Sequence, residues 1–278
     1  MALSNLAVSI ISYNRSHLLD LCLSSVQNAM QNQKYPVYVY IQDISPSDEA
    51  ILSKYKDLIS NITQIASNNR DVEDLINSNR ILAWEKSLLT NNHDYVVCLE
   101  DDVEISPDFF MFTEQVLIQN VQDKNFMGIN YGSFEKNLSN GSYSKIRYGI
   151  HGPASLISRK VLVKFQIRTL KKLKGKIAWD SWVEPITKIG FMATSNIARY
   201  RDNGVNGTHT SSTRDHVYFT KLEESFRVGL ENPIKAVVVR NVTHSWRADC
   251  IIFLSAENFK YSLRKKAMRL YQFLTIVR

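Results

Sequence analysis

The sequence has few of the residues that build small cross-linked or fibrous scaffolds. Its 278 residues include three cysteines, ten glycines and six prolines. Three cysteines, each in an apolar stretch, supply neither a disulfide framework nor a zinc cluster. We expect Cys22, Cys98 and Cys250 to be reduced thiols in the core. The 44% of hydrophobic residues is enough for a sizeable core, which excludes wholesale disorder.

Long apolar runs are also missing. No stretch approaches the roughly 18 consecutive apolar residues of a membrane-spanning helix. The first residues show neither a cationic start nor a cleavage site. We therefore expect a protein that is made and kept in the cytoplasm.

Positive charge is concentrated at the end of the chain. The formal net charge is +7, yet no acidic residue follows Glu257. The body is almost neutral, which argues against a nucleic-acid partner. Phe259, Leu263, Leu270 and Phe273 recur at helical spacing and predict a basic amphipathic helix over residues 256–278, after a domain over residues 1–255. This helix would either rest on an anionic membrane, placing the protein on its inner face, or dock on the core.

Extended apolar runs alternate with helical periodicity in the first half. Strands are predicted over residues 6–12, 37–41 and 95–99, and helices from Ser16 as N-cap to Met30 and over residues 47–58 and 71–89. A further helix opens at Ser106-Pro107, with the Ser106 hydroxyl as its cap, and another covers residues 159–173. Polar loops are expected over residues 132–148 and 201–215, and a late strand over residues 236–240. This order predicts an α/β fold with a mainly parallel sheet flanked by helices.

Three adjacent carboxylates, Glu100, Asp101 and Asp102, follow the most continuously apolar strand. In open α/β sheets, ligands bind beyond the carboxyl ends of the strands. Neighbouring carboxylates in such a crevice repel one another unless a cation offsets them. Oxygen ligands suit Mn²⁺ or Mg²⁺, and a diphosphate-bearing substrate would supply the remaining ligands. The alternative is an exposed acidic turn before a helix.

These segments resemble a known family. The residues from Val8 to Arg15 (VSIISYNR), Ile41-Gln-Asp43, Glu100 to Phe110 (EDDVEISPDFF) and Trp179-Asp-Ser-Trp182 look like a GT-A glycosyltransferase, and most like the N-acetylglucosaminyltransferase I family. Gly204-Val-Asn-Gly207 resembles the loop that covers the substrate in that family. The resemblance implies a GT-A, Rossmann-like fold and a metal-dependent transferase.

The resemblance also implies roles for single residues. Asp102 would bind the metal, and Asp180 would be the catalytic base that deprotonates the acceptor hydroxyl. The nucleotide sugar would be bound by Ser12, Arg15, Asp43, Glu100, Asp101 and Asn206. Ser181 and Asn206 depart from the residues expected in the family pattern, so the resemblance does not fix the donor or the acceptor.

Two kinds of side chain in these segments have alternative interpretations. His209 could reach the metal or a phosphate when its loop closes, or be a solvated loop residue. Trp179 and Trp182 could stack on the acceptor sugar, or pack in the core.

The resemblance therefore implies an inverting hexosyltransferase that moves N-acetylglucosamine, galactose or glucose from a UDP-sugar to a hydroxyl of a saccharide or lipid-linked saccharide acceptor. Surface polysaccharide biosynthesis would use such an enzyme. A sugar-phosphate nucleotidylyltransferase is the alternative enzyme, although the segment Ser12-Tyr-Asn-Arg15 lacks the glycine-rich phosphate loop that such enzymes need. A noncatalytic carbohydrate-binding or membrane-binding module is the third possibility.

Overall fold

The computed structural model describes residues 5–30, 33–66, 72–132, 142–146, 153–165, 190–204, 213–235 and 239–240. The chain divides into two compact units, Met1–Arg240 and Asn241–Arg278. The second unit lies outside the described residues, as do Cys250, the predicted boundary at residues 255–256 and the predicted C-terminal helix.

The first half of the chain alternates strands and helices, as the sequence predicts. In chain order the elements are β1 Leu6–Tyr13, α1 Ser16–Met30, β2 Val37–Gln42, α2 Pro46–Lys54, β3 Ile59–Ile65, α3 Val72–Trp84, the π-helix η1 Glu85–Thr90 and β4 Tyr95–Glu100. The elements that follow are β5 Val103–Ile105, α4 Phe109–Asn120, β6 Phe126–Asn130, β7 Tyr143–Ile146, β8 Ala154–Ser158, α5 Arg159–Phe165, β9 Phe191–Ser195, β10 Tyr200–Asp202, α8 Thr213–Glu231 and β11 Val239–Arg240.

The strands form a nine-stranded sheet and a two-stranded sheet. The order in the large sheet is β11-β7-β9-β6-β8-β4-β1-β2-β3, and β5 pairs with β10 in the small one. The pairs among β1, β2, β3 and β4 are parallel, whereas β8 runs antiparallel between β4 and β6. The predicted α/β fold with a mainly parallel sheet is confirmed.

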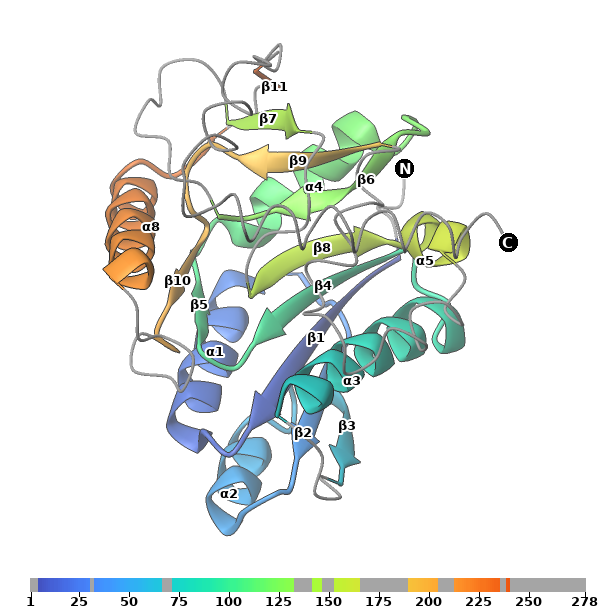
Figure 1. Cartoon of the computed structure of the whole chain (residues 1–278), viewed down its shortest axis with the longest axis vertical. Helices are drawn as coiled ribbons and strands as arrows, with labels where there is room; N and C mark the ends of the chain where they lie inside the picture. Colours follow the sequence, from blue (N-terminus) through green and yellow to red (C-terminus); the bar gives the residue numbers. More distant parts are fainter. Residues whose placement is uncertain are drawn as a thin grey trace. The chain divides into compact units, whose positions relative to one another are not determined.

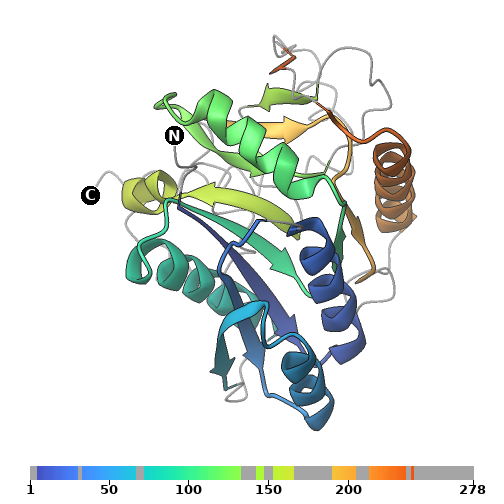
Figure 2. The ribbon, with the colours of Figure 1, turned by 180° about the vertical axis from the view of Figure 1, so that it is seen from behind.

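Helices cover both faces of the large sheet. Helices α1, α2 and α4 lie on one face, seen in Figure 2, and α3 and α5 lie on the other, seen in Figure 1. Alternate residues of β4 point to opposite faces of the sheet. Val97 packs into the core cluster that contains residues of α1 and α4, whereas Val96 and Cys98 pack in the cluster that contains Trp84. A strand that is buried on both faces needs no polar alternation, which explains the continuous apolar run of β4.

Several sequence predictions are wrong in detail near the helix ends. Helix α1 already includes Ser16, and the amide groups of Leu18 and Leu19 donate to the carbonyl of Arg15, so Ser16 is not the N-cap. Ser106 does not cap α4 either. Its hydroxyl donates to Asp108 Oδ1, 2.6 Å away, and Asp108 occupies the N-cap position.

Other predictions missed whole elements. The helix predicted over residues 47–58 ends at Lys54, and strand β3 follows at Ile59. The predicted loops over residues 132–148 and 201–215 contain β7, the last residues of β10 and the start of α8. Cys22 and Cys98 are free and buried, as expected. Among the described residues, no helix has the length and apolar character that crossing a membrane requires.

Candidate active site

The carboxyl ends of β1 and β4 bring two distant segments of the chain together. Ile11 is the register partner of Glu100, so the residues after β1 lie beside Asp101. The Ser12 hydroxyl and the Tyr13 amide donate to Asp101 Oδ2 over 2.9 and 3.0 Å. Asp101 is fully buried, and its carboxylate is therefore fixed by the end of β1.

Arg15 follows a tight turn after β1. Asn14 has a φ of 48°, in the left-handed region that asparagine tolerates better than most residues. The turn directs the Arg15 guanidinium to both aspartates: Nη1 donates to Asp102 Oδ2 at 2.7 Å, and Nη2 pairs with Asp101 Oδ1. The Arg15 guanidinium thus supplies part of the positive charge that offsets the carboxylates of the acidic triplet.

Glu100 has a different partner from the two aspartates. It forms an ion pair with Arg80, a fully buried arginine of α3. A buried guanidinium needs a carboxylate partner because an unpaired buried charge is strongly unfavourable. Arg80 gave no signal in the sequence, since it reads as one polar residue within a helical pattern.

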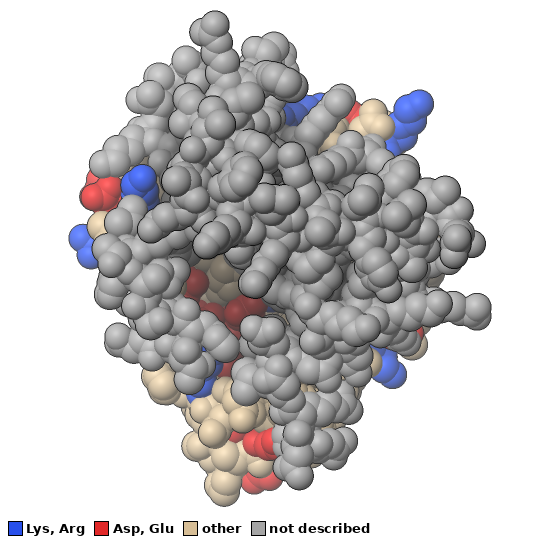
Figure 3. All heavy atoms as spheres, in the orientation of Figure 1, with Lys and Arg blue, Asp and Glu red and all other residues tan. Residues whose placement is uncertain are grey.

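A fourth carboxylate, Asp202, reaches the same place from the second sheet. Asp202 is the antiparallel partner of Val103, which directly follows Asp102. Burial and the charge of Asp102 raise the pKa of the Asp202 carboxyl to about 7, and burial raises the pKa of Asp101 to about 6 although the Arg15 charge lowers it. On the face of the molecule drawn in Figure 3, acidic side chains gather in a hollow.

The site meets the chemical demands of a hard divalent cation. Asp102 is only 7% exposed, and its Oδ1 atom accepts no hydrogen bond from the described residues. A methyl group added at Gly204 would lie 2.5 Å from Asp102 Oδ2, so a larger residue at this position would displace the Asp102 carboxylate. Within the described ranges, no three histidine, cysteine, aspartate or glutamate side chains are arranged to hold a metal. Mg²⁺ needs fewer, because it usually takes one or two carboxylates and completes its shell with water and phosphate oxygens.

Asp43 lies at the same edge of the sheet, directly after β2. It is exposed and has a φ of 47°. Because β2 is parallel to β1, Asp43 follows the strand end next to the one that carries Ser12 and Arg15. The structure therefore brings Ser12, Arg15, Glu100, Asp101 and Asp102 together and has Asp43 on the neighbouring strand. The other predicted site residues lie outside the described residues: Trp179, Asp180, Trp182, Asn206 and His209.

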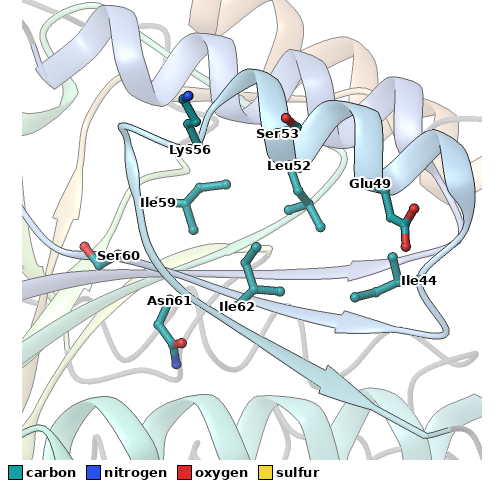
Figure 4. Close-up of a pocket in the computed structure, with 9 residues that line it drawn as sticks. All are labelled: Ile44, Glu49, Leu52, Ser53, Lys56, Ile59, Ser60, Asn61 and Ile62. Atoms are coloured by element: carbon teal, nitrogen blue, oxygen red, sulfur yellow. The ribbon is translucent and has the colours of Figure 1, made fainter.

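Two grooves differ in their relation to the acidic residues. One, of about 590 Å³, lies between β10 and α8 and includes Asp202, Asn203 and Glu223 in its lining. The other, of about 490 Å³, lies between α2 and β3, with Leu52 and Ile62 on its walls (Figure 4). Only the first contains one of the four clustered carboxylates, so we assign the second no part in the site.

The fold and the site together define an α/β protein with an acidic crevice at the carboxyl ends of its parallel strands, where ligands bind in such folds. No protein-family model matches the chain, and no curated protein matches it.

Many solved structures are similar to this chain. S. aureus TarS 1-349 is 11% identical, covers 82% of this chain and 75% of its own, and has a TM-score of 0.50. A longer S. aureus TarS chain is 13% identical with a TM-score of 0.51, over 83% of this chain and 46% of that chain. The mannosyltransferase PcManGT from Pyrobaculum calidifontis, in complex with GDP-Man and Mn²⁺, is 10% identical with a TM-score of 0.44, over 100% of this chain and 88% of its own.

At these identities the similarity concerns the fold alone, because one fold can host many functions. The resemblance to the N-acetylglucosaminyltransferase I family therefore stays a prediction.

Proposed function

We propose that the protein is a divalent-cation-dependent glycosyltransferase that uses a nucleoside diphosphate sugar. The observation that carries this proposal is the buried Asp102 carboxylate at the end of β4, whose Oδ1 atom has no partner among the described residues. Its position beyond the carboxyl end of a parallel strand supports nucleotide binding. The chain also shares its fold with S. aureus TarS, and this similarity supports the α/β architecture on which the proposal depends.

Asp102 would hold the cation through Oδ1, and water and the diphosphate oxygens would complete the shell. When bound, Mn²⁺ or Mg²⁺ would neutralise the negative charge that develops on the departing diphosphate. Asp101 would have a positioning role, since the Asp101 carboxylate already accepts hydrogen bonds from Ser12 and Tyr13 and pairs with Arg15.

Arg15 would bind the diphosphate. Its guanidinium is 35% exposed and sits over the two aspartates, so it is accessible from the crevice. Guanidinium groups bind phosphate oxygens through paired, charge-assisted hydrogen bonds. Asp43, on the adjacent strand, would contact the nucleoside, and Glu100 would orient the donor sugar.

The finer description follows from the sequence resemblance. Asp180 would take the proton of the acceptor hydroxyl on the face opposite the leaving group, so the anomeric configuration would invert. Trp179 and Trp182 would contact the acceptor saccharide. The donor would be a UDP-sugar carrying N-acetylglucosamine, galactose or glucose.

Nucleotide binding tests the proposal directly. Thermal unfolding of the full chain is measured with UDP, GDP, CDP and ADP, each with and without Mn²⁺. We expect UDP to raise the melting temperature only when Mn²⁺ is present, because a ligand that binds the folded state stabilises it.

Asp94→Asn is the matched control for Asp102→Asn. Asp94 precedes the same strand at its opposite end and also lies near an arginine, 3.4 Å from Arg159. Asp102→Asn should abolish the metal-dependent shift, and Asp94→Asn should keep it. If no nucleoside diphosphate gives a metal-dependent shift in the unsubstituted protein, the proposed function is wrong.

A further inference from the structure

The small sheet fixes Asp202 next to Asp102. Asp202 and Val103 are register partners in the antiparallel pair of β10 and β5. The amide of Asn203 donates to the backbone carbonyl of Asp102 at 2.8 Å, which ties the end of β10 to the acidic triplet. The two carboxylates are therefore held together by the backbone and not by a flexible loop.

The two carboxylates converge on Gly204. One point, the place that a methyl group on Gly204 would occupy, lies 2.5 Å from Asp102 Oδ2 and 3.0 Å from Asp202 Oδ1. The side chain of Asp102 is 9% exposed, and its Oδ1 atom has no hydrogen-bond partner in the described part of the chain. The structure thus combines two converging carboxylates with an unsatisfied buried oxygen.

Among the described residues, Asp202 forms no ion pair with an arginine. Arg15 pairs with Asp102, and Arg201, adjacent in sequence, pairs with Glu104 at 2.7 Å. Asp202 Oδ1 accepts the amide of Gly204 at 2.8 Å, which is a neutral donor. Two carboxylates at close range in a buried site are unfavourable without a cation.

We propose that Asp202 is the second protein ligand of the divalent cation, which it shares with Asp102. This inference rests on the proposed function and adds to it a ligand from the second sheet. Two carboxylates with water and diphosphate oxygens form the oxygen shell that Mg²⁺ and Mn²⁺ prefer.

Direct measurement of Mn²⁺ binding tests this inference without relying on turnover. The full chain is titrated with Mn²⁺ in the presence of UDP, and the free ion is followed by electron paramagnetic resonance. Asp202→Asn should weaken Mn²⁺ binding at least about tenfold, the lower end of the losses seen when residues around a metal are changed. Asp123→Asn, which removes a carboxylate that faces Lys145 at 3.7 Å, is the control and should bind as the unsubstituted protein does.

Gly204→Ala is the second variant, and it keeps every carboxylate. Its methyl group would lie 2.5 Å from Asp102 Oδ2 and 3.0 Å from Asp202 Oδ1 and would push the two carboxylates out of place, so Mn²⁺ affinity should also fall at least about tenfold. Gly229→Ala, in helix α8, is its matched control. Should Asp202→Asn not fold, the result for Gly204→Ala decides.

The outcomes separate this inference from the proposed function. Loss of Mn²⁺ affinity in both Asp102→Asn and Asp202→Asn supports the shared site. If Asp102→Asn loses Mn²⁺ while Asp202→Asn binds it normally, the inference is wrong and the proposed function stands. If the unsubstituted protein binds neither Mn²⁺ nor UDP, both are wrong.

Discussion

Arg15 donates to Asp102 over 2.7 Å, although the two residues are 87 positions apart in the sequence. The pair joins the turn after β1 to the residue proposed to bind the cation. A guanidinium and a divalent cation would compete for the Asp102 carboxylate in the free protein. A bound diphosphate would satisfy both, since it offers oxygens to the arginine and to the metal.

Replacing Arg15 with alanine should therefore have opposite effects on two ligands. Without nucleotide, Mn²⁺ should bind more tightly, because a competing positive charge is gone. With Mn²⁺ present, UDP should bind about 10- to 100-fold more weakly, since a hydrogen bond to a charged group contributes about 1.5–3 kcal/mol. Calorimetric titration of each ligand measures both effects.

Arg159→Ala is the control for the Arg15 variant. Arg159 contacts Asn92 and the carbonyl of His93, before the opposite end of β4. Both affinities should stay at the values of the unsubstituted protein. If Arg15→Ala binds Mn²⁺ and UDP with the affinities of the unsubstituted protein, the guanidinium does not take part in the site.

The resemblance of the segment Trp179-Asp-Ser-Trp182 predicts that Asp180 is the catalytic base. Changing it to asparagine removes the proposed base and keeps its size. Turnover should fall by about 10²–10⁴, the usual contribution of a general base, while UDP binding stays intact. Transfer rates and UDP affinity are measured on the same preparation, and an equal loss of both would contradict the role.

The N-terminus of α2 offers a test of stability. Ser45 and Asp48 form a capping box, and the Ser16 hydroxyl also donates to Asp48 at 2.7 Å. Ser45→Ala should lower the free energy of unfolding by about 1 kcal/mol in urea titrations at neutral pH. Ser53→Ala, an exposed change in the same helix, should have little effect.

The capping box also predicts a pH dependence. Burial raises the pKa of Asp48, but hydrogen bonds from Ser45 and Ser16 outweigh it and bring the pKa below the ordinary 3.8. A carboxyl with a lowered pKa in the folded state stabilises above the unfolded value and loses this contribution as the pH falls through the folded value. The cost of Asp48→Asn should therefore be full at pH 7 and shrink below about pH 4.

The buried pair of Arg199 and Asp108 should be the most sensitive ionic contact in the described core. The two side chains are 0% and 9% exposed and lie 2.9 Å apart, and Asp108 also accepts the amide of Ile234. Asp108→Ala should destabilise by about 3–5 kcal/mol because it leaves a buried arginine unpaired. Unfolding in urea measures this cost.

The double variant Asp108→Leu with Arg199→Met provides the check on that prediction. It removes both charges, so it should be less destabilised than Asp108→Ala alone. If the double variant is the less stable of the two, the cost does not come from the unpaired charge of Arg199.

Much of the fold could be predicted because strands that are buried on both faces leave a strong signal. The sequences of β1, β2 and β4 are mainly apolar and rich in β-branched residues. All three strands could be predicted for this reason. Strand β3, Ile59–Ile65, was missed because it is the edge of the sheet, and its residues 60–62 are exposed. An edge strand has little hydrophobic pattern from which to predict it.

Some residues of the site could be predicted from the sequence in the same way, and others could not. The acidic triplet was found because three carboxylates follow a buried strand, and Arg15 was found through the resemblance of its segment. Asp202 was missed, since it read as the second residue of a polar loop. Its pairing partner, Val103, lies about a hundred positions earlier, and no local pattern reports such a contact.

The sequence by itself determined the layered α/β arrangement and the position of the carboxylates after β4, because strand burial and chain order are local properties. Only the tertiary structure decided which charges meet. The pairing of Arg15 with Asp102, of Arg80 with Glu100, and the approach of Asp202 depend on the order and register of the strands, which place residues from distant segments within hydrogen-bonding distance.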